Sequence, residues 1–218
     1  MAKIVLIRPP CLVSTGAISA GLLSPPIALA YLAASVRNNG HEVSVVDAIG
    51  LDPEKKTYLG KKLFFVGISS SEILNLIPED IDLIGISGMF SYEWTALRPL
   101  VNMIGEKFRD KYFIAGGEHF TSVPEICLEQ CRDLDAIALG EGEETIVEIG
   151  EVLRAGSNDF SNIPGLAGKD GFVNPQTKVI QNLDDLPIPA WDMQPLKKYW
   201  EIARPHGSGF TDSDVAYA

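Results

Sequence analysis

The segments Ile4-Val5-Leu6-Ile7, Pro25 to Val36 and Val43 to Val46 decide the fold of this chain. The first and the third are short apolar runs, which is typical of strands covered on both faces of a sheet. Between them Pro25-Pro26 begins a helix, which ends at Asn38-Asn39-Gly40. The apolar residues of this helix recur at helical spacing, at Ala28, Leu29, Leu32, Ala33 and Val36. A strand, a helix and a second buried strand predict one unit of a parallel sheet with a right-handed crossover.

The same unit recurs as far as residue 155, with one less regular stretch from Gly50 to Ser71. Three more strands are expected at Leu83–Ile86, Tyr112–Ala115 and Ala136–Leu139. More helices are expected at Ser71–Ile77, Glu93–Phe108, Pro124–Gln130 and Glu143–Leu153. This alternation predicts an α/β domain over residues 1–155, with a flavodoxin-like (Rossmann-like), doubly wound parallel sheet of five strands in the order 2-1-3-4-5.

Residues 156–218 have a different pattern, which predicts a β-hairpin followed by a linker. Gly, Pro and Asn are frequent from Ile163 to Ile180, and a hairpin is expected around Gly165–Gly171 and Val179. The prolines between Leu183 and Trp200 exclude a central strand or a long regular helix. That segment is therefore expected to be an extended connector. Four apolar side chains are expected to pack it against the domain: Leu186, Ile188, Trp191 and Trp200. The last stretch, Arg204 to Ala218, has little apolar content.

The composition narrows the classes of partner. The chain has 218 residues and a formal net charge of −11, which argues against a nucleic acid partner because such partners require clustered Lys and Arg. The pairs Lys55-Lys56 and Lys61-Lys62 are expected to be solvated charge in a surface loop. No run approaches the roughly 18–20 apolar residues that span a bilayer, and Met1-Ala2-Lys3 has no signal-peptide layout. We expect a cytoplasmic protein.

The three cysteines do not form a metal or disulfide pattern. Cys11, Cys127 and Cys131 are an odd and sparse set, which fits a reducing compartment. The spacing of Cys127 and Cys131 also suits two small apolar residues on one helical face, and no third thiol lies nearby. We therefore expect buried cysteines and no iron–sulfur site, and no metal ligand is assigned.

The ligand site is expected beyond the carboxyl ends of the strands, at the switch point between strands one and three. The segment from Arg8 to Ser24, after strand one, is longer than the roughly two to six residues of typical βα loops, and it is mostly apolar. Glycines follow three strands in succession, in Ser87-Gly88-Met89, Gly116-Gly117 and Gly140-Glu141-Gly142. They would let a bulky ligand approach the backbone. Glycines also permit tight turns without any ligand, and that alternative stays open.

A dinucleotide site is a second interpretation of Gly140-Glu141-Gly142. These residues follow a strand and open a helix, as in a G-x-G-x-x-G fingerprint, but the third glycine is absent and the strand is the fifth. Glu143 and Glu144 occupy the helix start, where their carboxylates would repel a pyrophosphate. The sequence favours a large and mostly apolar ligand.

Several motifs in order along the chain resemble the N-terminal cobalamin (B12)-binding domain of B12-dependent radical S-adenosylmethionine (SAM) enzymes. They are Arg8-Pro9-Pro10, Pro25 to Ala34, Gly40-His41-Glu42-Val43, Ile86-Ser87-Gly88-Met89, Gly116 to Thr121 with Pro124-Glu125, Gly140 to Glu143, and Leu183 to Trp191. Singly these motifs are weak, but this order and spacing are fairly specific. The last of them is similar to the linker that precedes the radical SAM barrel in that family.

The resemblance implies that the domain holds cobalamin, with the nucleotide tail in the sheet edge and the corrin over the strand ends. Glycines would leave room for the benzimidazole beside the backbone. The cofactor-binding residues that it implies are Pro9, Pro10, Thr15, Gly16, Leu22, Leu23, Ser24, Ser87, Gly88, Met89, Gly116, Gly117, Glu118, His119, Gly140, Glu141 and Gly142. In the family, cobalamin serves methyl transfer to unactivated carbon, or ring formation and oxidation.

Two departures from related patterns limit what this chain can do alone. No histidine lies between Met1 and Gly40, so the D-x-H-x-x-G motif that ligates cobalt in methionine-synthase-type domains is absent. His119 is expected to form hydrogen bonds near the cofactor rather than to bind cobalt. The C-x-x-x-C-x-x-C motif of the [4Fe–4S] cluster is also absent. SAM and the cluster are therefore expected in a downstream domain, and this chain alone is not expected to be catalytic.

Two other interpretations remain, a free-standing corrinoid carrier and a receiver-like signalling module. A receiver needs an acidic cluster near strand one and an Asp after strand three. Here strand one ends in Arg8-Pro9-Pro10 and strand three in Ser87-Gly88-Met89.

Overall fold

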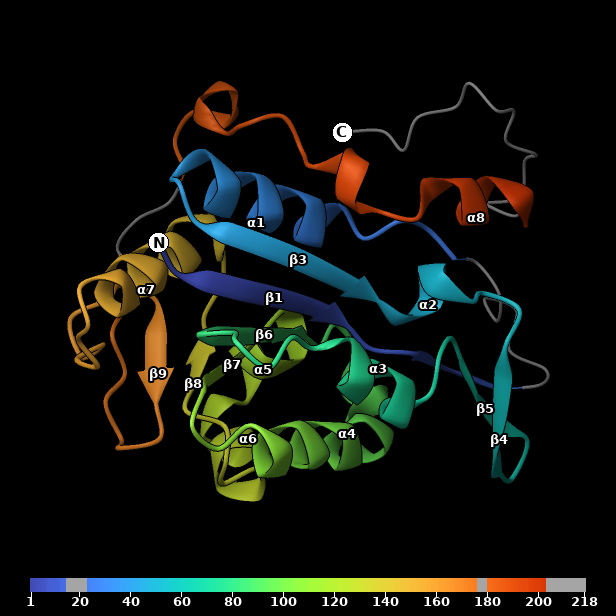
Figure 1. The fold of residues 1–218 in the computed structure, drawn as a ribbon. Coiled ribbons are helices and arrows are strands. Elements are labelled where there is room, and N and C mark those ends of the chain that lie inside the picture. Colours follow the sequence, from blue (N-terminus) through green and yellow to red (C-terminus); the bar gives the residue numbers. More distant parts are fainter. Residues whose placement is uncertain (15–22, 176–179, 203–218) are drawn as a thin grey trace.

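The main sheet has six strands in the order β3-β1-β6-β7-β8-β9 (Figure 1). This computed structural model describes residues 1–14, 23–175 and 180–202. The first five strands in that order are parallel: β3 (Glu42–Asp47), β1 (Lys3–Arg8), β6 (Leu83–Ser87), β7 (Tyr112–Gly116) and β8 (Ala136–Ala138). Together they confirm the predicted order 2-1-3-4-5. The sixth strand, β9 (Leu166–Gly168), was not predicted as part of this sheet and pairs antiparallel to β8.

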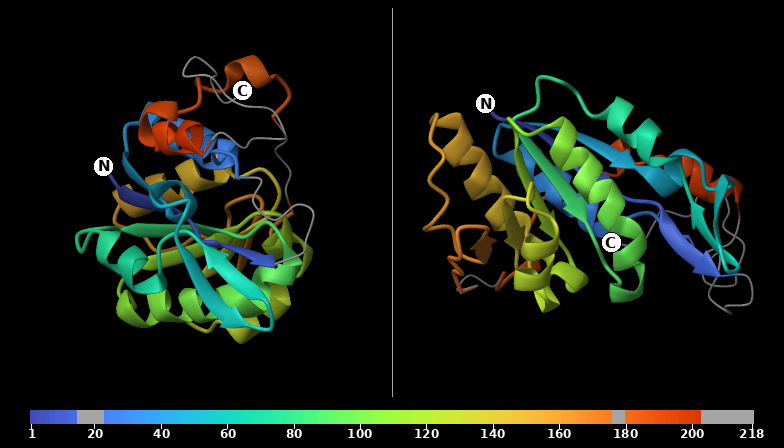
Figure 2. Two further views of the ribbon diagram at one scale, coloured as in Figure 1. Left: turned by 90° about the vertical axis from the view of Figure 1, so that its right-hand side faces the viewer. Right: turned by 90° about the horizontal axis from the view of Figure 1, so that it is seen from below.

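Helices cover both faces of this sheet, as Figures 1 and 2 show. On one face lie α1 (Ile27–Asn38) and α7 (Glu143–Arg154), with a core that includes Leu29, Ile4 and Ile149. On the other face lie α3 (Ser70–Leu76), α4 (Trp94–Lys107), α5 (Glu118–Ser122) and α6 (Pro124–Gln130). A one-turn 3-10 helix, η1 (Ser91–Glu93), precedes α4. Apart from α5, which the sequence did not suggest, these helices match the predicted ones.

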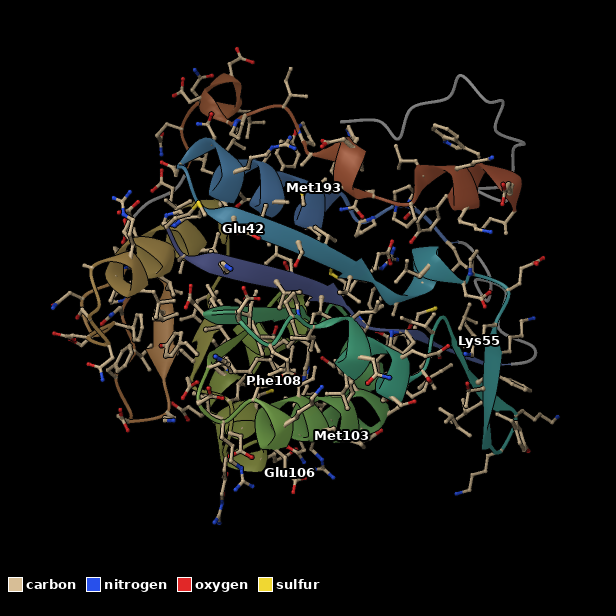
Figure 3. The ribbon with its side chains drawn as sticks, viewed as in Figure 1. Glu42, Lys55, Met103, Glu106, Phe108 and Met193 are labelled. Carbon is tan, nitrogen blue, oxygen red and sulfur yellow. The ribbon has the colours of Figure 1, made fainter. Side chains whose placement is uncertain are left out.

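Helix α4 illustrates why the spacing of apolar residues predicted the helices. Its apolar side faces the sheet, and Phe108, the residue directly after α4, is 2% exposed between the helix and the sheet (Figure 3). Met103 and Glu106 point away from the core. A stripe of apolar residues at period 3.6 is therefore a direct consequence of burial on one side only.

The prediction that the stretch from Gly50 to Ser71 is less regular is wrong, because this stretch contains a helix end and two strands. It holds the end of α2 (Ala48–Leu51) and a hairpin of β4 (Lys56–Gly60) and β5 (Leu63–Val66). β2 (Cys11–Ser14), which lies inside the predicted long loop, pairs with β5 and completes a small antiparallel sheet. Lys61 and Lys62 form the exposed turn of the hairpin with positive φ. Lys55, labelled in Figure 3, pairs with Glu72 at 2.6 Å.

The described residues after 155 pack back onto the first domain. β9 pairs with the main sheet. The predicted hairpin is present around Gly165–Gly171: its arms are joined by the Ala167–Val173 bridge and by backbone hydrogen bonds from Gly168 to Phe172, from Asn174 to Leu166 and from Gly165 to Pro175. Val179 lies outside the described residues. The linker then forms η2 (Leu183–Asp185), η3 (Trp191–Met193) and the short helix α8 (Leu196–Glu201) directly after Pro195.

The prediction that Ile188 packs against the domain is wrong, because its side chain is 85% exposed. Leu186, Trp191 and Trp200 are half-buried. Other linker residues are buried, namely Pro189, Ala190, Gln194 and Tyr199. The stretch from Arg204 to Ala218 lies outside the described residues.

The cysteine prediction is confirmed in its geometry. Cys127 and Cys131 are buried at 0% and 1% exposure in and directly after α6, and all three cysteines are free. Within residues 1–14, 23–175 and 180–202, no helix is long and apolar enough to cross a membrane.

Candidate binding site at the carboxyl edge of the sheet

A cavity of about 340 Å³ lies at the carboxyl ends of β1, β6, β7 and β8, between α1 and α7. Its walls are mostly aliphatic. The strands contribute Leu6, Ile7, Gly85, Ile86, Ser87, Ile114, Ala115, Gly116 and Ala138; the helices contribute Ala28, Leu29, Leu32, Glu118, Glu143 and Ile146; the loops contribute Met89, Gly117, Gly140, Glu141 and Gly142. The topology places it at the switch point between β1 and β6, where open α/β sheets bind their ligands.

Small residues make room for this cavity. A Cβ on Gly116 would have Ala138 Cβ as its nearest neighbour, at 3.7 Å, so a side chain there would extend into the cavity. A Cβ on Gly85 would lie 3.1 Å from Leu6 Cδ2. The space between the sheet and the two helices therefore exists because side chains are missing from the strands that line it.

The rim of the cavity is acidic. Glu118 and Glu141 are exposed, and Glu143 is half-buried in the first turn of α7. Burial raises the pKa of Glu143, and the neighbouring Glu141 carboxylate adds to this shift. Glu141 Oε2 also accepts a hydrogen bond from the Ile180 backbone N–H, at 3.1 Å. This charge argues against a pyrophosphate at the start of α7.

The structure brings about half of the predicted site residues together. Those that line the cavity are Ser87, Met89, Gly116, Gly117, Glu118, Gly140, Glu141 and Gly142. Pro9 and Pro10 are buried outside it, Leu23 belongs to a separate apolar cluster, and exposed Ser24 offers its carbonyl to Arg8. Thr15, Gly16 and Leu22 lie outside the described residues.

Gly88 and Gly117 allow two strand ends to meet closely. Gly117 has φ of +102°, and a Cβ on it would lie 2.7 Å from the carbonyl oxygen of Gly88. A Cβ on Gly88 would lie 2.4 Å from Cε2 of Phe120. Gly88 therefore leaves room for a ring of the protein itself, which the sequence could not reveal.

His119 lies behind the cavity rather than in its wall. It is 5% exposed, with Nδ1 at 3.0 Å from Ser91 Oγ and Nε2 at 3.4 Å from Cys127 Sγ. Its ring lies 5.0 Å from that of Trp94, and burial lowers its pKa. Both ring nitrogens therefore have partners within the protein, which join η1 to α6. A hydrogen bond from His119 near a bound cofactor stays a prediction.

The helix residues of the cavity wall were not predicted. Ala28, Leu29 and Leu32 of α1 line the cavity together with Ile146 of α7. Sequence analysis had assigned the first three only to packing of the helix on the sheet. Their position in the first turns of a helix that follows strand one was the available signal, because that end of the helix faces the carboxyl edge.

Comparison with known proteins decides the family. A model of the B12 binding domain matches residues 13–150. The chain belongs to this family. This B12-binding domain is 33% identical over 212 residues to an uncharacterized methyltransferase of Pyrococcus horikoshii, covering 94% of this chain and 41% of the relative. It is 27% identical over 103 residues to the cobalamin-dependent radical SAM methyltransferase TokK of Streptomyces tokunonensis, covering 45% and 15%.

A solved structure has the same fold. The radical SAM methyltransferase TsrM of Kitasatospora setae superposes with a TM-score of 0.55 at 19% identity, over 82% of this B12-binding domain and 31% of the TsrM chain. The described domain thus spans less than half the length of each of these proteins.

Proposed function

We propose that this chain is the cobalamin-binding part of a larger B12-dependent radical SAM enzyme, and that the cavity at the carboxyl edge receives the nucleotide tail of cobalamin. The observation that carries the proposal is the apolar cavity between α1, α7 and four strand ends. Its volume of about 340 Å³ is at the low end of the roughly 300–1,000 Å³ of ligand pockets. It suits a fused bicyclic base and is too small for a corrin.

The residues present fit such a base. Leu29 and Leu32 of α1 and Ile146 of α7 line the cavity and offer aliphatic surface to a flat ring. Gly116 leaves the space that the ring would fill. Ser87, half-buried at the end of β6, adds a hydroxyl group at the wall. Burial of an apolar ring between aliphatic side chains supplies affinity, and the single hydroxyl supplies orientation.

The rest of the cofactor would lie outside the cavity, where Met89 is 48% exposed at its rim. When bound, cobalamin supplies a cobalt centre that can carry a methyl group. Among the described residues, no group of three or more His, Cys, Asp or Glu side chains is placed to hold a metal ion. The contribution proposed for this chain is to hold and orient the tail.

The parent enzyme is proposed to transfer a methyl group to an unactivated carbon, with SAM and a [4Fe–4S] cluster bound by a downstream domain. The names of the two relatives, both methyltransferases, support methyl transfer over cyclisation or oxidation. A receiver-like module is disfavoured because Ser87, and no Asp, ends β6. A free-standing corrinoid carrier would lack C-x-x-x-C-x-x-C downstream in the gene.

Titration with hydroxocobalamin, followed by visible absorption and gel filtration, tests the site. Ala138→Leu adds bulk to the cavity wall, and Ala155→Leu makes the same change at an exposed position after α7. We expect co-elution with a shifted corrin band for the wild-type chain and Ala155→Leu, and at least about tenfold weaker binding for Ala138→Leu. Equal binding by the two variants would place the tail elsewhere. If neither the wild-type chain nor the full-length protein binds hydroxocobalamin, the proposed function is refuted.

A further inference from the structure

The side chain of Tyr199 on α8 is buried, although α8 lies outside the main fold. It is 2% exposed and forms a third apolar cluster with Leu23, Ile49 of α2 and Val66 of β5. Figure 1 shows α8 beside α2, at the end of the molecule where β1 and β3 end. The linker thus returns to the carboxyl ends of β1 and β3.

Tyr199 takes part in a buried polar cluster. Its hydroxyl donates a hydrogen bond to Asp47 Oδ2 and accepts one from Arg8 Nη1, at 2.8 Å. Asp47 is 1% exposed, and its Oδ1 lies 3.7 Å from Arg8 Nη1 and accepts from the Ile49 backbone N–H, at 3.2 Å. A buried carboxylate is tolerated only with such partners. Removal of the Tyr199 hydroxyl would leave Asp47 short of one of them.

Arg8 extends this cluster to Ser24, just before α1. The same Nη1 donates a second hydrogen bond to the carbonyl oxygen of Ser24, at 2.7 Å. Arg8 ends β1 directly after Ile7, which lines the cavity, and Ser24 lies just before α1. One guanidinium therefore joins α8 to the end of β1 and to Ser24, just before α1.

The absence of a side chain at Gly50 lets Pro195 and Tyr199 pack directly against α2. A Cβ on Gly50 would lie 2.4 Å from Pro195 Cγ and 2.6 Å from Tyr199 Cε2. The backbone of Gly50 is helical, so alanine suits its conformation, and the contacts that oppose it are those with Pro195 and Tyr199 and a 2.5 Å approach to Asp47 Oδ2. Gly50→Ala is therefore a way to disturb both the docking of α8 and the Asp47 carboxylate without removing any hydrogen-bonding group.

We propose that Arg8, Asp47 and Tyr199 form a latch, through which the docking of α8 fixes the backbone at Ser24, just before α1. Because the first turns of α1 line the cavity, docking of α8 and binding of the ligand favour each other. Coupling of this kind is reciprocal. The consequence for cobalamin rests on the proposed function, whereas the latch itself does not.

Hydrogen exchange with and without hydroxocobalamin tests the latch. In Tyr199→Phe and in Gly50→Ala, we expect about tenfold faster exchange both in α8 and in Cys11–Ser14, relative to the wild-type chain. The matched control is Tyr58→Phe, because Tyr58 is 64% exposed on β4. We also expect hydroxocobalamin to slow exchange in α8 of the wild-type chain but not of Tyr199→Phe, and to bind about 5- to 20-fold more weakly to that variant.

Three results would overturn the latch. The first is an unchanged exchange rate in α8 of both variants. The second is faster exchange in α8 without faster exchange at Cys11–Ser14. The third is that hydroxocobalamin slows exchange in α8 of Tyr199→Phe as much as in the wild-type chain. If the wild-type chain and the full-length protein do not bind hydroxocobalamin, the proposed function fails. The hydrogen-exchange rates of α8 and Cys11–Ser14 measured without cofactor then still show whether the latch exists.

Discussion

The ring of Phe120 occupies the space beside Gly88, where a Cβ would lie 2.4 Å from its Cε2 atom. Phe120 is fully buried and meets Trp94 edge-on, with ring centroids 5.4 Å apart. Gly116, on the neighbouring strand, has no such neighbour, because the nearest atom to its Cβ would be 3.7 Å away. Two glycines at adjacent strand ends therefore serve different purposes, one for packing and one for the cavity.

Gly88→Ala and Gly116→Ala should differ in stability. We expect Gly88→Ala to lower the free energy of unfolding by about 1–3 kcal/mol, because the added methyl group overpacks a closed core. Gly116→Ala should leave it within about 1 kcal/mol, because the methyl group enters open space in a strand that alanine suits. Urea unfolding followed by circular dichroism measures both. Equal losses would mean that the cavity at Gly116 is closed in solution.

Leu32→Ala tests the helical wall of the cavity. Leu32 is half-buried, and loss of its aliphatic contact with a bound ring should weaken hydroxocobalamin binding about tenfold, since a buried leucine side chain contributes about 1.5–3 kcal/mol. The matched control is Leu76→Ala on α3, where the side chain is 49% exposed, and its affinity should equal that of the wild-type chain. Calorimetric titration of the three proteins decides the matter. Wild-type affinity in Leu32→Ala would show that α1 does not touch the ligand.

The order of the main sheet was predictable because each parallel strand is a buried apolar run followed by a helix with its own periodicity. The small sheet was not, because β2 pairs with a strand far away in sequence, with Cys11 opposite Val66. Only the run Leu63–Val66 carried a strand signal, and its flanking lysines suggested a surface loop.

The candidate site was predictable only at its strand ends. Glycines marked the edge correctly, but nothing in the sequence separates Gly88 from Gly116, since the difference depends on the ring of Phe120. In the linker, apolar character favoured Ile188, which is exposed, over Tyr199, which carries a hydroxyl group and is buried. Tyr199 is held by Arg8, 191 residues away, and no local pattern reports such a pair.

The start of α3 should make stability depend on pH. Glu72 accepts hydrogen bonds from Lys55 and from the side chain and backbone of Ser69, and these lower its pKa to about 2. Because the pKa is lower in the folded chain than in the unfolded chain, the stabilisation is complete above the ordinary value of 4.5 and is lost as pH falls through about 2.

We therefore expect Glu72→Gln to be less stable than the wild-type chain at pH 7, with a difference that shrinks between pH 4.5 and pH 2. Urea unfolding at several pH values measures it. The exposed Glu54 provides the control, and Glu54→Gln should stay close to wild type at each pH. A difference for Glu72→Gln that is constant down to pH 2 would mean that its carboxylate is not held as described.

The three thiols should be nearly inert in the folded chain. Burial raises the pKa of Cys11 and of Cys127 to about 11 and that of Cys131 to about 12. At pH 8 the reactive thiolate is then about one part in a thousand or less, because each pH unit changes it tenfold. We expect slow reaction of the native chain with dithionitrobenzoate, Cys11 first because it is half-exposed, and rapid reaction of all three thiols in denaturant. Cys11→Ser leaves the two buried thiols, which should react only on unfolding. Rapid reaction of two thiols in native Cys11→Ser would show that the end of α6 opens readily and that Cys127 and Cys131 are not fixed parts of the core.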